Sequence, residues 1–244
     1  MRTKCFSGFP KEGLAFLRSL KRNNNREWFQ EHKSIYENVV KQPMSELVEA
    51  LAVDFEKFAP EMLASPKASV YRIYRDTRFS TDKTPYKTHA AAVFPHRALE
   101  KHGGAGFYLH ISTTELLIGG GVYMPLPEDL NAIRRHIEEN PELFIDIVQS
   151  KKFRQMFGAL GGEQLSRVPR GFPSDHRAAD YLRHKQYLAG RTMKAESATS
   201  PDFYRTVIET FKGMVPMIRF LNEPILRARR LRDRQQAVLD ERLK

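Results

Sequence analysis

The sequence predicts an α+β protein, in which a central antiparallel meander sheet of about four to five strands is flanked by N-terminal and C-terminal helices. Two observations predict this class. Apolar residues recur at helical spacing before residue 58 and again after residue 127, whereas the stretch between residues 66 and 123 alternates and is rich in β-forming residues. Consecutive strands joined by short loops are expected to pair antiparallel, because a parallel pair needs a long crossover.

The first helix is predicted from an apolar stripe at Leu14, Phe16, Leu17 and Leu20. Residues 23–25 are three asparagines, which we expect to end it because Asn tolerates a left-handed C-cap. A second helix is expected over residues 26–40, and Pro43 should end or kink it. A third then runs to about Phe58. Its expected inward side chains include Leu47, Leu51, Val53 and Phe55.

Four strands are predicted in the middle of the chain, and a fifth after it. The expected ranges are 69–79, 90–94, 107–112, 115–123 and 186–194. Thr113-Thr114 is short enough for a tight hairpin turn.

Helical pattern returns after Pro127, a residue that suits a helix start. The expected segments are helix to about Phe157, a loop over 161–172, a helix over 174–185, and closing helices over 202–221 and 224–243. We therefore expect one α+β domain over residues 1–222 and a basic helical extension over residues 223–244.

The composition bears on the cellular location of the protein and on the charge of its binding partners. The 244 residues include 40 Lys+Arg against 29 Asp+Glu, a net charge of +11, which favours an anionic partner. Much of the excess lies in the last helix, so solvated arginines explain it equally well. The single cysteine, Cys5, is expected to be a buried small residue and indicates a reducing, cytoplasmic location. No secretory signal and no membrane-length apolar run are recognised.

The most informative segment is Tyr71–His89, which is basic and rich in tyrosine. As a strand it would place Arg72, Tyr74, Asp76 and Arg78 on one face. If that face meets the polar side of residues 107–112, then Arg72, Tyr74, Tyr108 and His110 form a common floor. Residues 80–89 would form its rim, stiffened by Pro85.

Such a floor suits an anion, because guanidinium groups offer paired donors to phosphate or carboxylate. Its expected ligand-binding residues are Arg72, Tyr74, Arg75, Arg78, Asp82, Lys83, Lys87, Tyr108, Gly120 and Gly121. The candidates for proton transfer or orientation are His110, His89 and Asp76. The alternative is an Arg–Asp–Tyr network that satisfies itself within the sheet.

Gly119-Gly120-Gly121 lies late in a predicted strand and indicates a bulge, or the close approach of another chain segment or a ligand. No phosphate loop, zinc-protease or serine-hydrolase motif is present, and the sequence indicates no metal set and no particular cofactor.

Several motifs together resemble an uncharacterised family, domain of unknown function 2461. They are Asn23–Phe29, Tyr71–His89, Phe107–His110, Gly119–Pro125, and Pro169–Pro173 with Asp175-His176. The resemblance covers about residues 6–222. It implies a single family domain and a bacterial-type cytosolic protein, and it implies no activity and no catalytic residue.

Three hypotheses stay open at this point. The first is a binding domain or enzyme for a phosphorylated small molecule or nucleotide. The second is a nucleic-acid-binding module that stacks bases on Tyr74 and Tyr108. The third is an interaction protein whose basic C-terminal helix docks an acidic partner. Whether the protein is an enzyme is left open.

Overall fold

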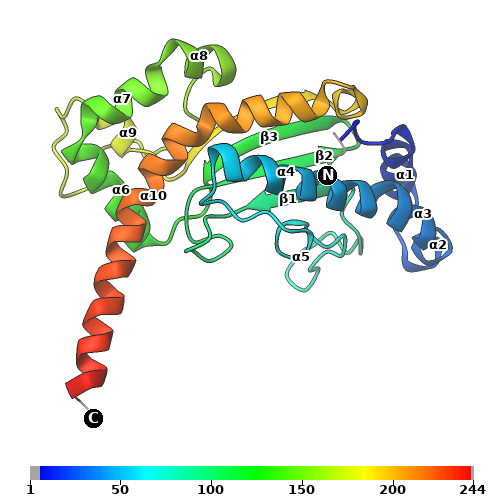
Figure 1. Ribbon diagram of the computed structural model, residues 1–244, viewed down its shortest axis with the longest axis horizontal. Coiled ribbons are helices and arrows are strands. Elements are labelled where there is room, and N and C mark those ends of the chain that lie inside the picture. Colours follow the sequence, from blue (N-terminus) through cyan, green and yellow to red (C-terminus); the bar gives the residue numbers. More distant parts are fainter. Residues whose placement is uncertain (1–5, 243–244) are drawn as a thin grey trace. The chain divides into compact units, whose positions relative to one another are not determined.

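The computed structural model describes residues 6–242, so the prediction made for Cys5 lies outside the described residues. The chain divides into two compact units (Figure 1). Unit 1 comprises Met1–Phe94, Phe107–Gly119 and Gly190–Lys212. Unit 2 comprises Pro95–Gly106, Gly120–Ala189 and Gly213–Lys244. The single domain expected over residues 1–222 stays a prediction.

A four-stranded antiparallel sheet with the order β1-β2-β3-β4 confirms the predicted meander. Its strands are β1 (His89–Phe94), β2 (Gly106–Ser112), β3 (Glu115–Val122) and β4 (Tyr187–Lys194). In the β1–β2 register, His89 lies opposite Ser112 and Val93 lies opposite Tyr108. The two-residue turn between Ser112 and Glu115 falls where the sequence places it.

The strand expected over residues 69–79 does not form. After a short helix, α5 (Pro66–Ser69), only isolated bridges join Val70 to Ala92 and Tyr74 to Tyr86. Local side chains take the backbone groups that a strand ladder would use: Asp76 accepts from the N–H of Arg78, and Lys83 donates to the carbonyl of Thr77. Residues 70–88 therefore form an irregular extended ribbon beside β1.

The N-terminal helices of unit 1 largely follow the apolar pattern. They are α1 (Lys11–Arg22), α2 (Arg26–Glu31), α3 (Lys33–Tyr36), the π-helical turn η1 (Glu37–Lys41) and α4 (Gln42–Phe58). The second predicted helix is thus broken into pieces, and Pro43 lies in the first turn of α4. Asn23 does end α1, but with a φ of −126°, so the expected left-handed cap is wrong.

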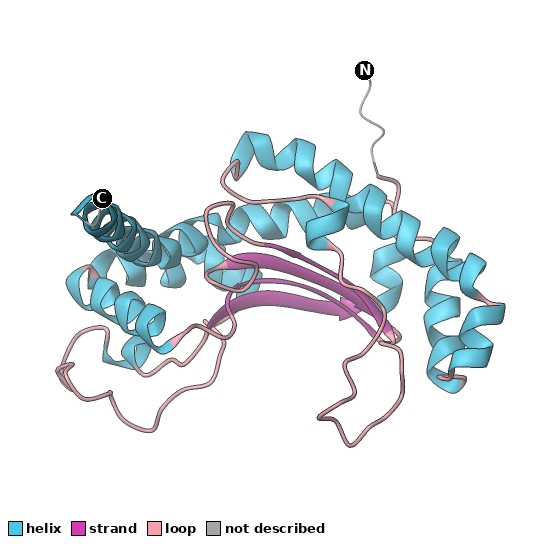
Figure 2. Ribbon diagram, turned by 90° about the horizontal axis from the view of Figure 1, so that it is seen from below, coloured by secondary structure: helices cyan, strands magenta, loops and turns pink. Residues whose placement is uncertain are grey.

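Aromatic side chains fill the core of unit 1 between the sheet and the helices. The rings of Phe107 on β2 and Phe211 are stacked with centroids 4.5 Å apart, and Phe55 of α4 meets Phe94 edge-on at 5.3 Å. Figure 2 shows helices packed along one face of the strands. Val53 was expected in this core but is 45% exposed, because it lies on the solvent side of α4.

Unit 2 is mainly helical. Its helices are α6 (Pro127–Glu139), α7 (Pro141–Gln149), α8 (Lys151–Phe157), α9 (Ala179–Leu182) and the larger part of α10 (Phe203–Arg242). The helix expected over residues 174–185 shrinks to α9, and its first residues form turns. The two predicted closing helices are one, since α10 continues through Pro216 and Pro224.

A short 3₁₀ turn, η2 (Ala195–Thr199), links β4 to α10. Across residues 6–242, no helix has an apolar stretch long enough to cross a bilayer.

Candidate functional site

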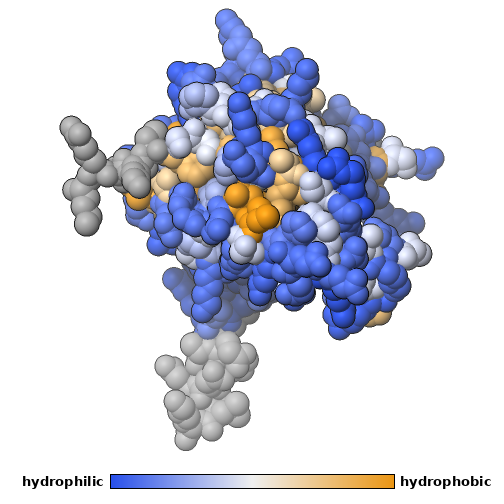
Figure 3. Space-filling model, turned by 90° about the vertical axis from the view of Figure 1, so that its right-hand side faces the viewer, coloured by the Kyte–Doolittle hydropathy of each residue, from blue (hydrophilic) through white to orange (hydrophobic). Residues whose placement is uncertain are grey.

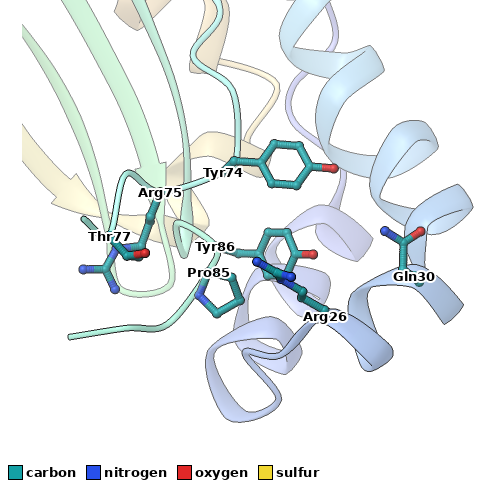
Figure 4. Close-up of a pocket in the computed structure, with 7 residues that line it drawn as sticks. All are labelled: Arg26, Gln30, Tyr74, Arg75, Thr77, Pro85 and Tyr86. Carbon is teal, nitrogen blue, oxygen red and sulfur yellow. The ribbon is translucent and has the colours of Figure 1, made fainter. Parts of the chain in front are cut away.

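A pocket of about 280 Å³ lies in unit 1 between α2 and the irregular ribbon (Figure 4). Its lining residues are Arg26, Gln30, Tyr74, Arg75, Thr77, Pro85 and Tyr86. In Figure 4 the side chains of Arg26 and Gln30 extend from the helix, and the rings of Tyr74 and Tyr86 extend toward them from the ribbon. A cation, an amide and two phenols therefore face one hollow.

Consecutive asparagines position the helical side of this pocket. The side chain of Asn25 accepts a hydrogen bond of 2.9 Å from the N–H of Trp28 and caps α2, which begins at Arg26. Asn24 exchanges hydrogen bonds of 2.9 and 3.1 Å with the carbonyl and N–H of Tyr86. The start of α2 is thereby tied to the opposite wall.

Aromatic packing fixes the two tyrosines. Phe29 is buried and stacks on Tyr86 with ring centroids 4.1 Å apart, and it meets Tyr74 edge-on at 6.2 Å. Tyr86 is 2% exposed, whereas Tyr74 is 46% exposed. Tyr86 thus forms the base of the pocket, and Tyr74 presents part of its ring to solvent.

The two pocket arginines differ in their partners. Arg75 forms an ion pair with Asp82 and a hydrogen bond to Thr84, so its charge is used within the loop. The N–H of Thr84 and the guanidinium of Arg75 lower the pKa of Asp82 to about 2. Arg26, by contrast, pairs with no carboxylate among residues 6–234, whose side chains the structure describes. Its charge therefore remains available to the pocket.

Burial acts on the phenols around Arg26. Burial and then the neighbouring Tyr74 raise the pKa of Tyr86, although Arg26 opposes this shift. Burial, and after it Glu37 and Tyr74, raise the pKa of Tyr36 well above its usual range, although Tyr36 lies outside the pocket lining. The hydroxyl of Tyr86 is therefore neutral near pH 7 and adds no negative charge against an anion in the pocket.

Figure 3 views the side on which α1–α3 lie in Figure 1, and that surface is mostly hydrophilic with a small hydrophobic group near its centre. On α3, Ile35 is a large apolar side chain that is 45% exposed. An isolated apolar side chain of this kind is normal on a protein surface.

A second polar cluster lies on the sheet of unit 1, where Tyr108 and His110 share a face of β2. The hydroxyl of Tyr108 lies 3.2 Å from Nδ1 of His110, and Nε2 of His110 lies 3.1 Å from Oε1 of Glu115. Residues two apart in a strand point the same way, and the tight turn returns Glu115 to the same end of the hairpin. Tyr108, His110 and Glu115 form what we call the hydrogen-bonded chain.

Three further side chains surround the hydrogen-bonded chain. The ring of Tyr71 meets that of Tyr108 at 6.5 Å, and the rings of His89 and His110 are 5.5 Å apart. The ammonium of Lys87 lies 5.1 Å from the centre of the Tyr71 ring. Burial, helped by His110 and Lys87, lowers the pKa of His89 to about 4. His89 is therefore neutral near pH 7.

Only part of the predicted polar floor, made of Arg72, Tyr74, Tyr108 and His110, is present in the structure. Tyr108 and His110 do meet, and residues 72, 74, 76 and 78 are indeed the more exposed alternate set. The partner of Tyr108 from the ribbon, however, is Tyr71 rather than Arg72, and Tyr74 lies in the Arg26 pocket. The ribbon meets β1 at the isolated bridge between Val70 and Ala92 and forms no ladder with it, and its less exposed alternate set turns to the sheet.

The remaining predicted ligand-binding residues mostly act within the ribbon. Arg78 pairs with Asp76 and, by hydrogen bonding first, lowers the pKa of that carboxyl to about 2. Lys83 donates to the carbonyl of Thr77, and Lys87 donates to that of Arg72. Their ligand-binding roles, like the catalytic roles of Asp76, His89 and His110, stay predictions.

The glycines of unit 2 face the chain's own backbone. A Cβ on Gly121, whose φ is +125°, would lie 1.9 Å from the carbonyl oxygen of Tyr187. One on Gly120 would lie 2.8 Å from the oxygen of Gly106. The close approach inferred from the triple glycine is thus made by neighbouring strands, and a ligand role for Gly120 and Gly121 stays a prediction.

The candidate set drawn from the sequence lacks six of the residues that form these sites: Arg26, Gln30, Thr77, Pro85 and Tyr86 of the pocket, and Glu115 of the hydrogen-bonded chain. Gln30 is one helical turn from Arg26, a spacing that would have placed it on the same face. Glu115 follows the predicted turn directly, so its pairing with the β2 face could have been inferred from the hairpin. Among residues 6–242, no cluster of three or more His, Cys, Asp or Glu is arranged to hold a metal ion.

The fold and the two polar clusters define an α+β protein that carries its candidate sites on and beside a four-stranded meander. The sequence model of the conserved hypothetical protein family DUF2461 matches residues 12–220. The chain therefore belongs to the DUF2461 family. No curated protein matches it.

Proposed function

We propose that this protein binds a phosphorylated small molecule or nucleotide in the pocket between Arg26 and Tyr74. The observation that carries the proposal is the Arg26 guanidinium, which has no described carboxylate partner and faces a hollow lined by phenols. A guanidinium offers paired N–H donors that match two oxygens of a phosphate.

The other lining groups suit the rest of such a ligand. The half-exposed ring of Tyr74 supplies a face on which a base or sugar can stack, and Gln30 supplies both an amide donor and an acceptor. A volume of about 280 Å³ lies near the lower end for ligand pockets, which favours a mononucleotide or sugar phosphate over a dinucleotide.

Thermal unfolding with and without adenosine monophosphate tests this function. Ligand at about 100 times its Kd should raise the Tm by roughly 5–10 °C. Arg26→Ala should abolish the increase without changing the Tm of the ligand-free protein by more than about 2 °C, because Arg26 is exposed.

The matched control is Arg22→Ala, which removes an exposed arginine that contacts Ser19 on α1 and lies outside the pocket lining. It should keep the full response. Inorganic phosphate and pyrophosphate, tested in parallel, report whether the phosphate alone suffices. The proposal fails if none of the three probes raises the Tm, or if Arg22→Ala and Arg26→Ala lose the response equally.

A second candidate is single-stranded nucleic-acid binding along the same ribbon. Phe79 is 96% exposed, and the guanidinium of Arg78 lies 5.7 Å from its ring centre. Exposed aromatic rings with adjacent arginines stack successive bases. A fluorescent oligonucleotide should then lose most of its affinity for Phe79→Ser, and affinity should fall steeply with salt. Equal affinity of wild type and Phe79→Ser would exclude this function.

A further inference from the structure

The hydrogen-bonded chain on β2 has a defined direction. An ionised carboxylate can only accept hydrogen bonds, so the 3.1 Å contact between Glu115 and His110 places a proton on Nε2 of the imidazole. In neutral imidazole Nδ1 is then the acceptor. The hydroxyl of Tyr108, 3.2 Å away, must therefore donate to it.

This order matches the general arrangement of an activated nucleophile, in which a base contacts the reactive group and a third group orients the base. If His110 takes up the Tyr108 proton, the resulting imidazolium is stabilised by Glu115. The phenolate is left beside the Tyr71 ring, over which the Lys87 ammonium lies.

The neighbouring His89 does not oppose the transfer. Its ring centroid is 5.5 Å from that of His110, so a charge on it would disfavour a second imidazolium. Burial keeps His89 neutral near pH 7, because its pKa is about 4. The site therefore contains one base that can accept the proton without repulsion from its nearest imidazole neighbour.

We propose that Tyr108 is a proton-transferring phenol, activated by His110 and oriented through Glu115, which acts on a small anionic substrate that carries a hydroxyl or carbonyl group. The substrate's negative charge would be attracted by Lys87. In the forward step the phenolate oxygen takes a proton from the substrate, and the proton that it first released rests on Nδ1 of His110. In this scheme His110 is the base that holds the Tyr108 proton, and Glu115 is a positioning residue.

An electrophilic probe tests the activation directly and needs no knowledge of the substrate. Phenylmethanesulfonyl fluoride reacts with a phenolate: an S–O bond forms, the S–F bond breaks, fluoride leaves, and the phenolic proton goes to His110. Labelling is measured at each tyrosine by peptide mass spectrometry. Tyr123 is the internal reference, because it is 65% exposed and reports the reactivity of an ordinary phenol.

The expected result is that Tyr108, although half-buried, is labelled about tenfold faster than Tyr123. His110→Gln and Glu115→Gln should each bring Tyr108 to the rate of Tyr123 or below, with Tyr123 unchanged. Glu115 is 45% exposed at the hairpin end, so its variant tests the chain even if His110→Gln fails to fold. Arg26→Ala should leave Tyr108 labelling unchanged, which separates this site from the anion pocket.

Two outcomes would overturn the proposal. One is labelling of Tyr108 that is no faster than that of Tyr123 in the wild-type protein. The other is fast labelling of Tyr108 that persists in a folded Glu115→Gln variant, since the contacts would then be structural and would not activate the phenol.

Discussion

Asn24 pairs with the backbone of Tyr86 as a neighbouring strand would, accepting from its N–H at 3.1 Å and donating to its carbonyl at 2.9 Å. The side chain of Asn24 thereby takes the place of a paired strand at Tyr86. It joins the loop before α2 to the base of the Arg26 pocket. Integrity of that pocket thus depends on a residue that does not line it.

Asn24→Ala should lower the free energy of unfolding by about 1–3 kcal/mol, because both backbone groups of Tyr86 lose their partner. It should also reduce the Tm increase produced by adenosine monophosphate, since α2 is released from the opposite wall. Urea denaturation measures the first effect. Asn23→Ala is the control: the side chain of Asn23 donates to the carbonyl of Ser19 at the end of α1, so the ligand response should be kept.

In unit 2, the side chain of Asn222 pairs with the backbone of Ala105 in the same way. It is 2% exposed, accepts from the N–H of Ala105 at 2.7 Å and donates to its carbonyl at 2.9 Å. Asn222→Leu keeps the branched shape of the side chain but leaves two buried backbone groups unsatisfied, so it should cost about 2–5 kcal/mol in urea denaturation. Asn131→Leu, at an exposed position of α6, should change stability by less than about 0.5 kcal/mol. Equal effects of the two variants would refute this account.

Gly121 cannot carry a side chain, because its Cβ would lie 1.9 Å from the carbonyl oxygen of Tyr187 and its φ is +125°. Gly121→Ala should therefore destabilise the protein by about 3–5 kcal/mol. Gly158 separates the steric clash from the backbone strain. Its φ is also positive, at +74°, but its Cβ would meet no atom within 4 Å. Gly158→Ala should cost only about 1–2 kcal/mol. Circular dichroism on heating measures both, and similar losses would argue against the steric cause.

His89 should make stability depend on pH in a predictable direction. Burial lowers its pKa from 6.5 to about 4, so between these values the unfolded chain binds the proton more readily than the folded protein. The contribution is complete above pH 6.5 and is lost as the pH falls toward 4. His89→Gln should lose less stability than the wild type between pH 7 and pH 5, as measured by urea denaturation. His136 and His184, whose pKa values burial also lowers, continue to contribute in both proteins.

The regular elements were predictable because their signals are local. The apolar stripe of α1, the two-threonine turn and the β-rich ranges of β1–β4 each follow from side chains a few residues apart, and the structure confirms them. The strand expected over residues 69–79 failed for a local reason as well. Asp76, Lys83 and their neighbours bond to nearby backbone, a competition that alternation of side chains does not reveal.

The candidate site was predictable in its composition but not in its grouping. The sequence selects Tyr74, Arg75, Tyr108 and His110, and these residues do line the pocket or form the hydrogen-bonded chain. It assigns Arg72 and Tyr74 to the floor beside Tyr108, whereas Tyr71 takes that position. The error arises because the ribbon meets β1 at one isolated bridge, Val70 to Ala92, and no pattern within the ribbon fixes which of its two faces turns inward.

The sequence by itself determined the α+β class, the meander order and the residues from which a polar site could be made. Only the tertiary structure decided that Arg26 faces Tyr74 across a pocket, and that Glu115, His110 and Tyr108 form one hydrogen-bonded chain. The physical reason is that periodicity records which side of an element is buried, whereas a site depends on distances of about 3 Å between side chains of different elements. Those distances are set by packing, such as the stack of Phe29 on Tyr86, and by cross-chain bonds such as that from Asn24.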